Sequence, residues 1–98
     1  MDKKWWIIGI GGSDTDDVDM YKFYGTKEEI KKCLLEKVIN DQPTDNNEND
    51  YDGWQYGTDN INDIVERPNG SLYAYNCYTD SHTDYVALPL NKIIELKI

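Results

Sequence analysis

The stretch Trp5-Trp6-Ile7-Ile8-Gly9-Ile10 decides the fold of this chain. Its side chains are apolar at both odd and even positions, so a strand built from them is apolar on both faces, which predicts a central position in a sheet. Gly11-Gly12-Ser13 ends this strand. Val18 to Tyr24 follows after a short acidic loop and alternates in character, with Met20 and Lys22 on one face. The two segments together predict a β-hairpin.

The residues that follow this hairpin predict the main helix. Thr26-Lys27-Glu28-Glu29 has the pattern of a capping box, in which the Thr26 hydroxyl accepts from the Glu29 amide and the Glu29 carboxylate accepts from the Thr26 amide. An apolar stripe at helical spacing comes next and predicts a face that packs on a sheet. The stripe consists of Ile30, Cys33, Leu34 and Val38. The helix is expected to end before Pro43, because proline cannot continue it.

A second, shorter helix is predicted after a polar loop. Ile61, Ile64 and Val65 have the spacing of one helical face. Thr58 would be the N-cap of this helix, and Asp59 would place a favourable negative charge in its first turn.

The last third of the chain predicts strands. After the turn at Pro68-Asn69-Gly70, residues Ser71 to Tyr78 alternate in character and predict one strand. Asp84 to Leu88 would be its partner across a polar turn, which makes a second hairpin. Ile93 to Lys97 would add a final short strand.

The sequence therefore predicts a single α+β domain over residues 1–98. Its sheet would be antiparallel, with four to five strands in two hairpins, and the main helix would pack on one face. The expected order is β-β-α-(short α)-β-β-β. A polar loop at about residues 40–53, rich in Asn and Asp, is expected to be mobile and acidic.

The charge of the chain is strongly asymmetric. It has 19 Asp and Glu against 10 Lys and Arg, which gives a net charge of −9. Eight of the acidic residues lie between Val38 and Glu66, where there is no Lys or Arg. A field of one sign repels phosphate and attracts basic surfaces. We therefore expect no direct nucleic-acid binding, and we expect a basic protein surface as the class of partner.

The composition also predicts a compartment. The chain has two cysteines, which do not make a disulfide framework. No stretch approaches the roughly 20 apolar residues of a membrane span, and the apolar run from Trp5 to Ile10 is too short for a signal peptide. These features predict a cytoplasmic protein with reduced thiols and no membrane span. They do not determine its oligomeric state.

A second acidic stretch offers candidate ligands for a metal ion. Asp14, Asp16, Asp17 and Asp19 could supply the oxygen atoms that Ca²⁺ prefers. The stretch lacks the mid-loop Gly and the closing Glu of an EF-hand. The alternative interpretation is a solvated hairpin loop, and no cofactor is predicted.

Cys77 and His82 form the only candidate for a nucleophilic catalytic site in the sequence. His82 is the only histidine, five residues after Cys77, and Asp84 follows it. Cys77 falls inside a predicted strand and His82 at a hairpin tip, where a catalytic pair lacks support. We therefore expect that Cys77 packs in the sheet, that His82 is a turn residue and that the protein is not an enzyme.

The resulting hypothesis is a small acidic interaction module without enzymatic activity. It would present the surface from Asp41 to Glu66 to a basic, nucleic-acid-handling protein. Trp54 would be the anchor. The other expected contact and steering residues are Asp50, Asp52, Tyr56, Asp59 and Asp63.

In size, charge and composition the chain resembles small phage-encoded inhibitors such as anti-restriction and anti-CRISPR proteins, although no motif assigns it to one of those families. This resemblance implies an inhibitor carried by a phage or another mobile element. The scarcity of Arg and the abundance of Lys, Ile, Asn and Tyr are typical of AT-rich genomes, including low-GC bacteria. Two alternatives stay open: a divalent-cation-binding domain that uses Asp14 to Asp19, and a small bacterial protein without a ligand.

Overall fold

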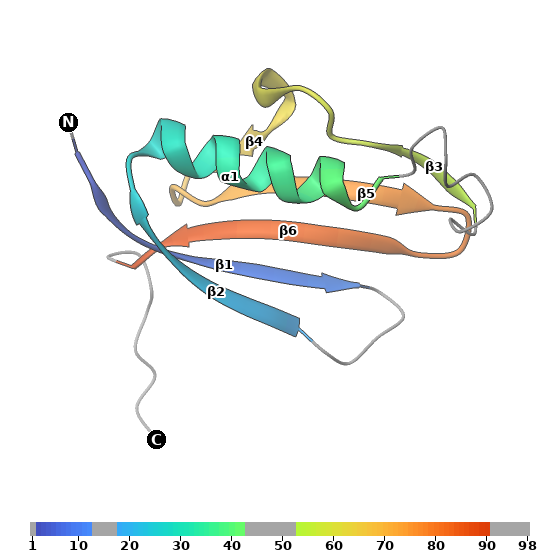
Figure 1. Cartoon of the computed structure of the whole chain (residues 1–98), viewed down its shortest axis with the longest axis horizontal. Helices are drawn as coiled ribbons and strands as arrows, with labels where there is room; N and C mark the ends of the chain where they lie inside the picture. Colours follow the sequence, from blue (N-terminus) through green and yellow to red (C-terminus); the bar gives the residue numbers. More distant parts are fainter. Residues whose placement is uncertain (1, 13–17, 43–52, 91–98) are drawn as a thin grey trace.

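The computed structural model describes residues 2–12, 18–42 and 53–90 (Figure 1). Within these ranges a single antiparallel sheet has the strand order β2-β1-β6-β5-β3, and a short strand, β4, pairs with β5. One α-helix packs on this sheet, so the chain is an α+β fold. The elements are β1 (Lys4–Gly12), β2 (Val18–Gly25), α1 (Lys27–Asn40), β3 (Trp54–Gly57), the 3₁₀ helix η1 (Ile61–Asp63), β4 (Val65–Glu66), β5 (Leu72–Tyr78) and β6 (His82–Pro89).

The arrangement of the predicted elements is confirmed. β1 lies between β2 and β6, as its two apolar faces indicated, and both expected hairpins, β1–β2 and β5–β6, form. The capping box at the start of α1 is present, with Thr26 Oγ1 accepting from the Glu29 amide at 3.2 Å. Figure 1 shows α1 lying along one side of the sheet.

Two details of the prediction were wrong. The sheet has six strands rather than four to five, because β3 and β4 add two short ones at its far end. The second helix is only the three-residue η1, and Thr58 does not cap it. Thr58 pairs with β5 instead: its amide donates to Tyr75 O at 2.9 Å and its hydroxyl accepts from the Tyr75 amide at 3.2 Å. Asn60 is the cap of η1.

Two predictions lie outside the described residues. These are the polar loop, of which residues 43–52 are not described, and the final strand at Ile93 to Lys97.

The apolar core lies between α1 and the sheet. The buried residues of α1 are Ile30, Leu34 and Val38, at the spacing that the sequence indicated. They belong to one cluster with Trp6 and Ile8 of β1 and with Leu72, Ala74, Tyr85 and Ala87 of β5 and β6. Helix and sheet are therefore joined through one side of the sheet.

A buried polar side chain links the end of the helix to the sheet. Asn76 of β5 is fully buried, and its amide nitrogen donates to Val38 O and to Tyr85 Oη, both at 3.1 Å. Its amide oxygen accepts from Gln42 Nε2 at 3.0 Å and from Trp54 Nε1 at 3.3 Å. Every hydrogen-bonding position of the amide is thus used, which a buried polar group requires.

This linkage predicts a large effect of one substitution on stability. Asn76→Ala leaves Val38 O and the donors of Gln42 and Trp54 without their partner, so it should lower the free energy of unfolding by about 2–3 kcal/mol. Urea denaturation measures the effect. Asn62→Ala, at an exposed position of η1, is the control and should change stability by less than about 0.5 kcal/mol. Equal effects of the two variants would contradict the role of Asn76.

Candidate functional site

The side of the sheet opposite α1 is the most distinctive surface of the molecule. Residues that lie directly opposite one another in neighbouring antiparallel strands share a face. The register places Ile8 beside Ala87 on the side of α1, whereas Ile7 lies beside Leu88 on the other side. We call this second side the open face. Its described side chains are Trp5, Ile7, Val18, Met20, Lys22, Tyr24, Tyr56, Val65, Tyr73, Tyr75, Cys77, His82, Asp84, Val86 and Leu88.

The open face is rich in aromatic and apolar groups that remain exposed. Trp5 is 45% exposed, Tyr24 and Tyr56 are each 53% exposed, and Met20 is 62% exposed. Neither described helix covers them, because α1 and the residues around η1 pack into the core on the other side. Exposed contiguous apolar areas of this kind mark interaction sites in soluble proteins.

Ring contacts organise the open face. Trp5 and Tyr24 lie with their ring centroids 5.0 Å apart at one end, and Tyr73 stacks on Tyr75 at 5.8 Å near the other. Tyr56 meets Tyr75 edge to face at 6.0 Å. Such pairs fix the rings in place, so the aromatic surface is preformed.

Cations already lie on two of these rings. Lys22 Nζ lies 4.8 Å from the Trp5 centroid, and Arg67 Cζ lies 4.7 Å from the Tyr73 centroid. Both contacts have the geometry of cation–π interactions. Two cations of this chain are therefore already held on aromatic rings of the open face.

The acidic group of the open face is bound within the sheet. Tyr73 Oη donates to Asp84 Oδ1 at 2.7 Å, and His82 Nε2 lies 3.1 Å from Asp84 Oδ2. Partial burial, together with the hydrogen bond to Asp84 and its negative charge, raises the pKa of Tyr73 from 10.0 to about 12.

The structure separates the two aromatic residues predicted to act together. Trp54 pairs with Tyr78 but Tyr56 pairs with Cys77, so the register shifts between them. This bulge sends their side chains to opposite sides of the sheet. Trp54 is half-buried and donates its indole N–H to Asn76, whereas Tyr56 is exposed on the open face.

The predicted acidic surface is only partly described. Asp59 is exposed just before η1 and Asp63 is exposed as the last residue of η1, while Asp50 and Asp52 lie outside the described residues. Two other acidic groups of the same stretch are engaged by the fold: Asp41 Oδ2 accepts from Tyr85 Oη at 2.5 Å, and Glu66 forms ion pairs with Lys27 and Lys31.

The candidate metal ligands are likewise incomplete. Asp19 is exposed on β2, and Asp14, Asp16 and Asp17 lie outside the described residues. In the described part of the chain, no group of three or more His, Cys, Asp or Glu side chains could hold a metal ion. Asp19 does line a hollow of about 280 Å³ together with Lys37 and Asp41.

Cys77 and His82 lie closer than the sequence indicated. They are directly opposite in the β5–β6 register, and His82 is the first residue of β6 rather than part of the turn. The cysteine is partly buried in the sheet, as expected. This Cys-His-Asp group lies on the surface of the sheet.

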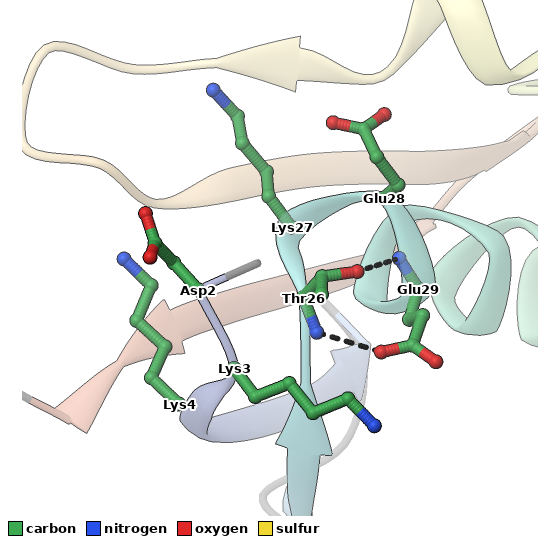
Figure 2. Close-up of a pocket in the computed structure, with 7 residues that line it drawn as sticks. All are labelled: Asp2, Lys3, Lys4, Thr26, Lys27, Glu28 and Glu29. Carbon is green, nitrogen blue, oxygen red and sulfur yellow. Dashed lines mark hydrogen bonds between the residues drawn. The ribbon is translucent and has the colours of Figure 1, made fainter.

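A larger hollow, of about 560 Å³, lies beside the start of α1 (Figure 2). Lys3, Lys4 and Lys27 line it, and Figure 2 shows the side chains of Lys4 and Lys27 extending the same way and that of Lys3 extending in another direction. Glu29 Oε1 accepts from the Thr26 amide at 2.8 Å and Thr26 Oγ1 accepts from the Glu29 amide, so the capping box uses two of the amides at the start of the helix. The hydrogen bond from the Thr26 amide also lowers the pKa of Glu29.

Sequence analysis missed the open face as a site. Its strands alternate correctly, but each was interpreted by itself, and the side to be covered by the single helix was not assigned. One pattern in the sequence could have identified it. In β5, Leu72 and Ala74 alternate with Tyr73 and Tyr75, so the strand has a small apolar side for the helix and an aromatic side opposite it.

Comparison of the chain with protein-family models, with curated proteins and with solved structures yields no significant match. Within the described residues, no helix has the length and apolar character needed to cross a membrane.

The raised pKa of Tyr73 predicts a pH dependence. The folded protein retains the Tyr73 proton up to about pH 12, whereas the unfolded chain releases it near the ordinary value of 10.0. Stability from this group is therefore complete below about pH 10 and is lost as the pH rises through about 12. Urea denaturation across this range should show a smaller loss for Tyr73→Phe than for the wild type; an identical loss would contradict the assignment.

Proposed function

We propose that the protein is a non-enzymatic interaction module that binds a basic protein through the open face. The observation that carries this proposal is the preformed aromatic surface that no described helix covers. Tyr and Trp provide large contact area at low cost in conformational entropy. A net charge of −9 would steer a basic partner toward the molecule.

The aromatic side chains and the acidic ones have different roles in this proposal. Tyr24 and Tyr56 are the exposed rings on which Arg or Lys side chains of the partner would lie. Asp59 and Asp63 would act at longer range and accelerate association. Asp50 and Asp52 are proposed to share the steering role, on the basis of the sequence. In this proposal Tyr24 and Tyr56 take the role of anchor in place of Trp54, whose indole N–H donates to Asn76.

The charge of the chain favours a protein over nucleic acid as the proposed partner. Exposed aromatic residues on a sheet also stack on bases in proteins that bind single strands. Those proteins neutralise phosphates with clustered cations. Two described cations of the open face, Lys22 and Arg67, each lie over an aromatic ring of this chain. We therefore propose a basic, nucleic-acid-handling protein as the partner. From the resemblance in size, charge and composition to phage-encoded inhibitors, we also propose an inhibitory role in a phage or another mobile element.

Two tyrosines of β2 provide a matched test. Tyr24 is 53% exposed on the open face, and Tyr21 is 44% exposed on the side of α1. Binding to a panel of basic DNA-binding domains is measured by calorimetry, with a single-stranded DNA oligonucleotide as a separate arm. Tyr24→Ala and Tyr56→Ala should each weaken binding by about tenfold or more, whereas Tyr21→Ala should change it by less than about threefold.

Salt gives the second criterion of this test. Affinity for the basic domains should fall as salt rises, because the steering charges are screened. Three results would contradict the proposal: equal effects of Tyr21→Ala and Tyr24→Ala, affinity that is indifferent to salt, or tighter binding to the oligonucleotide than to every basic domain.

The divalent-cation alternative has its own test. The placement of Asp19 beside the hollow that Asp41 also lines is the observation that keeps this alternative in view. If the stretch from Asp14 to Asp19 binds Ca²⁺ or Mg²⁺, calorimetry should detect heat and the melting temperature should rise with cation concentration. Asp19→Asn should reduce both signals. Absence of heat and of a shift in melting temperature would exclude this function.

A further inference from the structure

The outer edge of β2 has the features of a strand that pairs with another chain. β2 is at the end of the strand order, and its eight residues are in continuous antiparallel register with β1. Among the described strands, none pairs with its other side. The outward N–H and C=O groups of such an edge are a template for a further strand.

The opposite edge of the sheet is protected, which makes the exposure of β2 more significant. There the edge is divided between β3, of four residues, and β4, of two residues, and β3 contains a bulge. Short, interrupted and bulged edges resist pairing with other chains. β2 has no proline and no register shift. Its one lysine, Lys22, lies over the Trp5 ring of the same chain.

β2 carries two exposed apolar side chains near its start. Val18 is 57% exposed and Met20 is 62% exposed, although both belong to a strand. Pairing with a further strand would bury part of this surface and so would stabilise an assembly. The exposed edge and its apolar side chains therefore favour pairing with another strand over an isolated monomer.

Beside this edge lie one negative and one positive side chain, Asp19 and Lys37, so the edges of two copies could have complementary charges. On the side of α1, Asp19 of β2 and Lys37 of α1 line the same hollow, and Lys37 Nζ lies 4.3 Å from the Tyr21 centroid. Among the described residues, neither Asp19 nor Lys37 has an ion pair within 4.0 Å. Asp41, which also lines the hollow, is bound by Tyr85.

We infer that β2 pairs with β2 of a second copy of this chain and extends the sheet across a two-fold axis. Antiparallel pairing of identical strands places that axis perpendicular to the sheet, so both copies keep α1 on the same side. A register centred on Lys22 would bring two lysines together and is disfavoured. In a register centred on Met20, Asp19 lies opposite Tyr21 of the other copy, and in a register centred on Tyr21 it lies diagonal to that residue. Lys37 of the other copy overlies this Tyr21 ring, so Asp19 could form an ion pair with it.

The dimer has a consequence for binding. The two open faces lie on the same side of the extended sheet, so a dimer presents two docking surfaces to one partner or to two. This consequence rests on the proposed function, whereas the strand pairing does not. Loss of partner binding by an intact dimer would contradict the function alone.

Sedimentation equilibrium of the full chain tests the pairing. The mass should rise with protein concentration from 11.4 kDa toward twice that value. Asp19→Lys and Lys37→Asp each place like charges in both symmetric contacts, so each should weaken the dimer by about tenfold or more. The double variant Asp19→Lys/Lys37→Asp restores opposite charges and should return the dissociation constant to within about threefold of the wild type.

Two controls carry the same changes of charge at exposed positions away from this edge. They are Asp80→Lys, in the turn between β5 and β6, and Lys32→Asp, on α1. Neither should change the dissociation constant by more than about threefold. Circular dichroism confirms that every variant is folded at the temperature of the measurement.

Amide hydrogen exchange identifies the surface used. Exchange in β2 should slow as the concentration rises, whereas amides of β3 should not change. A full chain that remains a monomer would overturn the inference. So would a dimer that responds equally to the swaps and the controls. A third result would also overturn the inference. If a chain ending at Leu90 dimerises and the full chain does not, residues 91–98 and not a second copy would be the partner of the β2 edge.

Discussion

A single helix can cover only one side of this sheet, and the other features of the molecule depend on that constraint. α1 has 14 residues and is therefore about 21 Å long. The sheet is five strands wide, because β3 and β4 share the edge beside β5, and at a spacing of about 4.8 Å its width is comparable to the length of the helix. The helix buries its stripe of Ile30, Leu34 and Val38 on one side. The aromatic residues on the other side are left to solvent or to a partner.

The position of the helix is fixed by polar as well as apolar contacts. Asn76 bonds to the last turn of α1 through Val38 O and to β3 through Trp54, so one amide joins three elements. Gly57 makes this possible, because a Cβ there would collide with Asn76 Oδ1. A buried amide with all partners in place specifies one arrangement, since any shift leaves several groups unsatisfied. The hydrogen bonds of Asn76 thus fix the position of α1 and β3 on the sheet.

The fold engages some acidic residues of the acidic stretch and leaves others exposed. Asp41 and Glu66 belong to the acidic stretch of the sequence, but one binds Tyr85 and the other binds two lysines of α1. Asp59 and Asp63 stay exposed. The negative charge thus has two roles, structural bonds at some positions and a long-range field at others. Surfaces with little net charge, the open face and the β2 edge, are left for close contact.

Elements whose patterns are local could be predicted from the amino-acid sequence. The capping box at Thr26, the helical stripe and the alternation in both hairpins each depend on residues within a few positions of one another, and all were predictable. Only the tertiary structure decided what depends on distant residues. β3 and β4 exist because β5 supplies their hydrogen bonds, and the bulge that separates Trp54 from Tyr56 arises in that pairing. The open face and the exposed edge of β2 follow from which side α1 covers and which strand comes last, and neither is encoded in any short stretch of sequence.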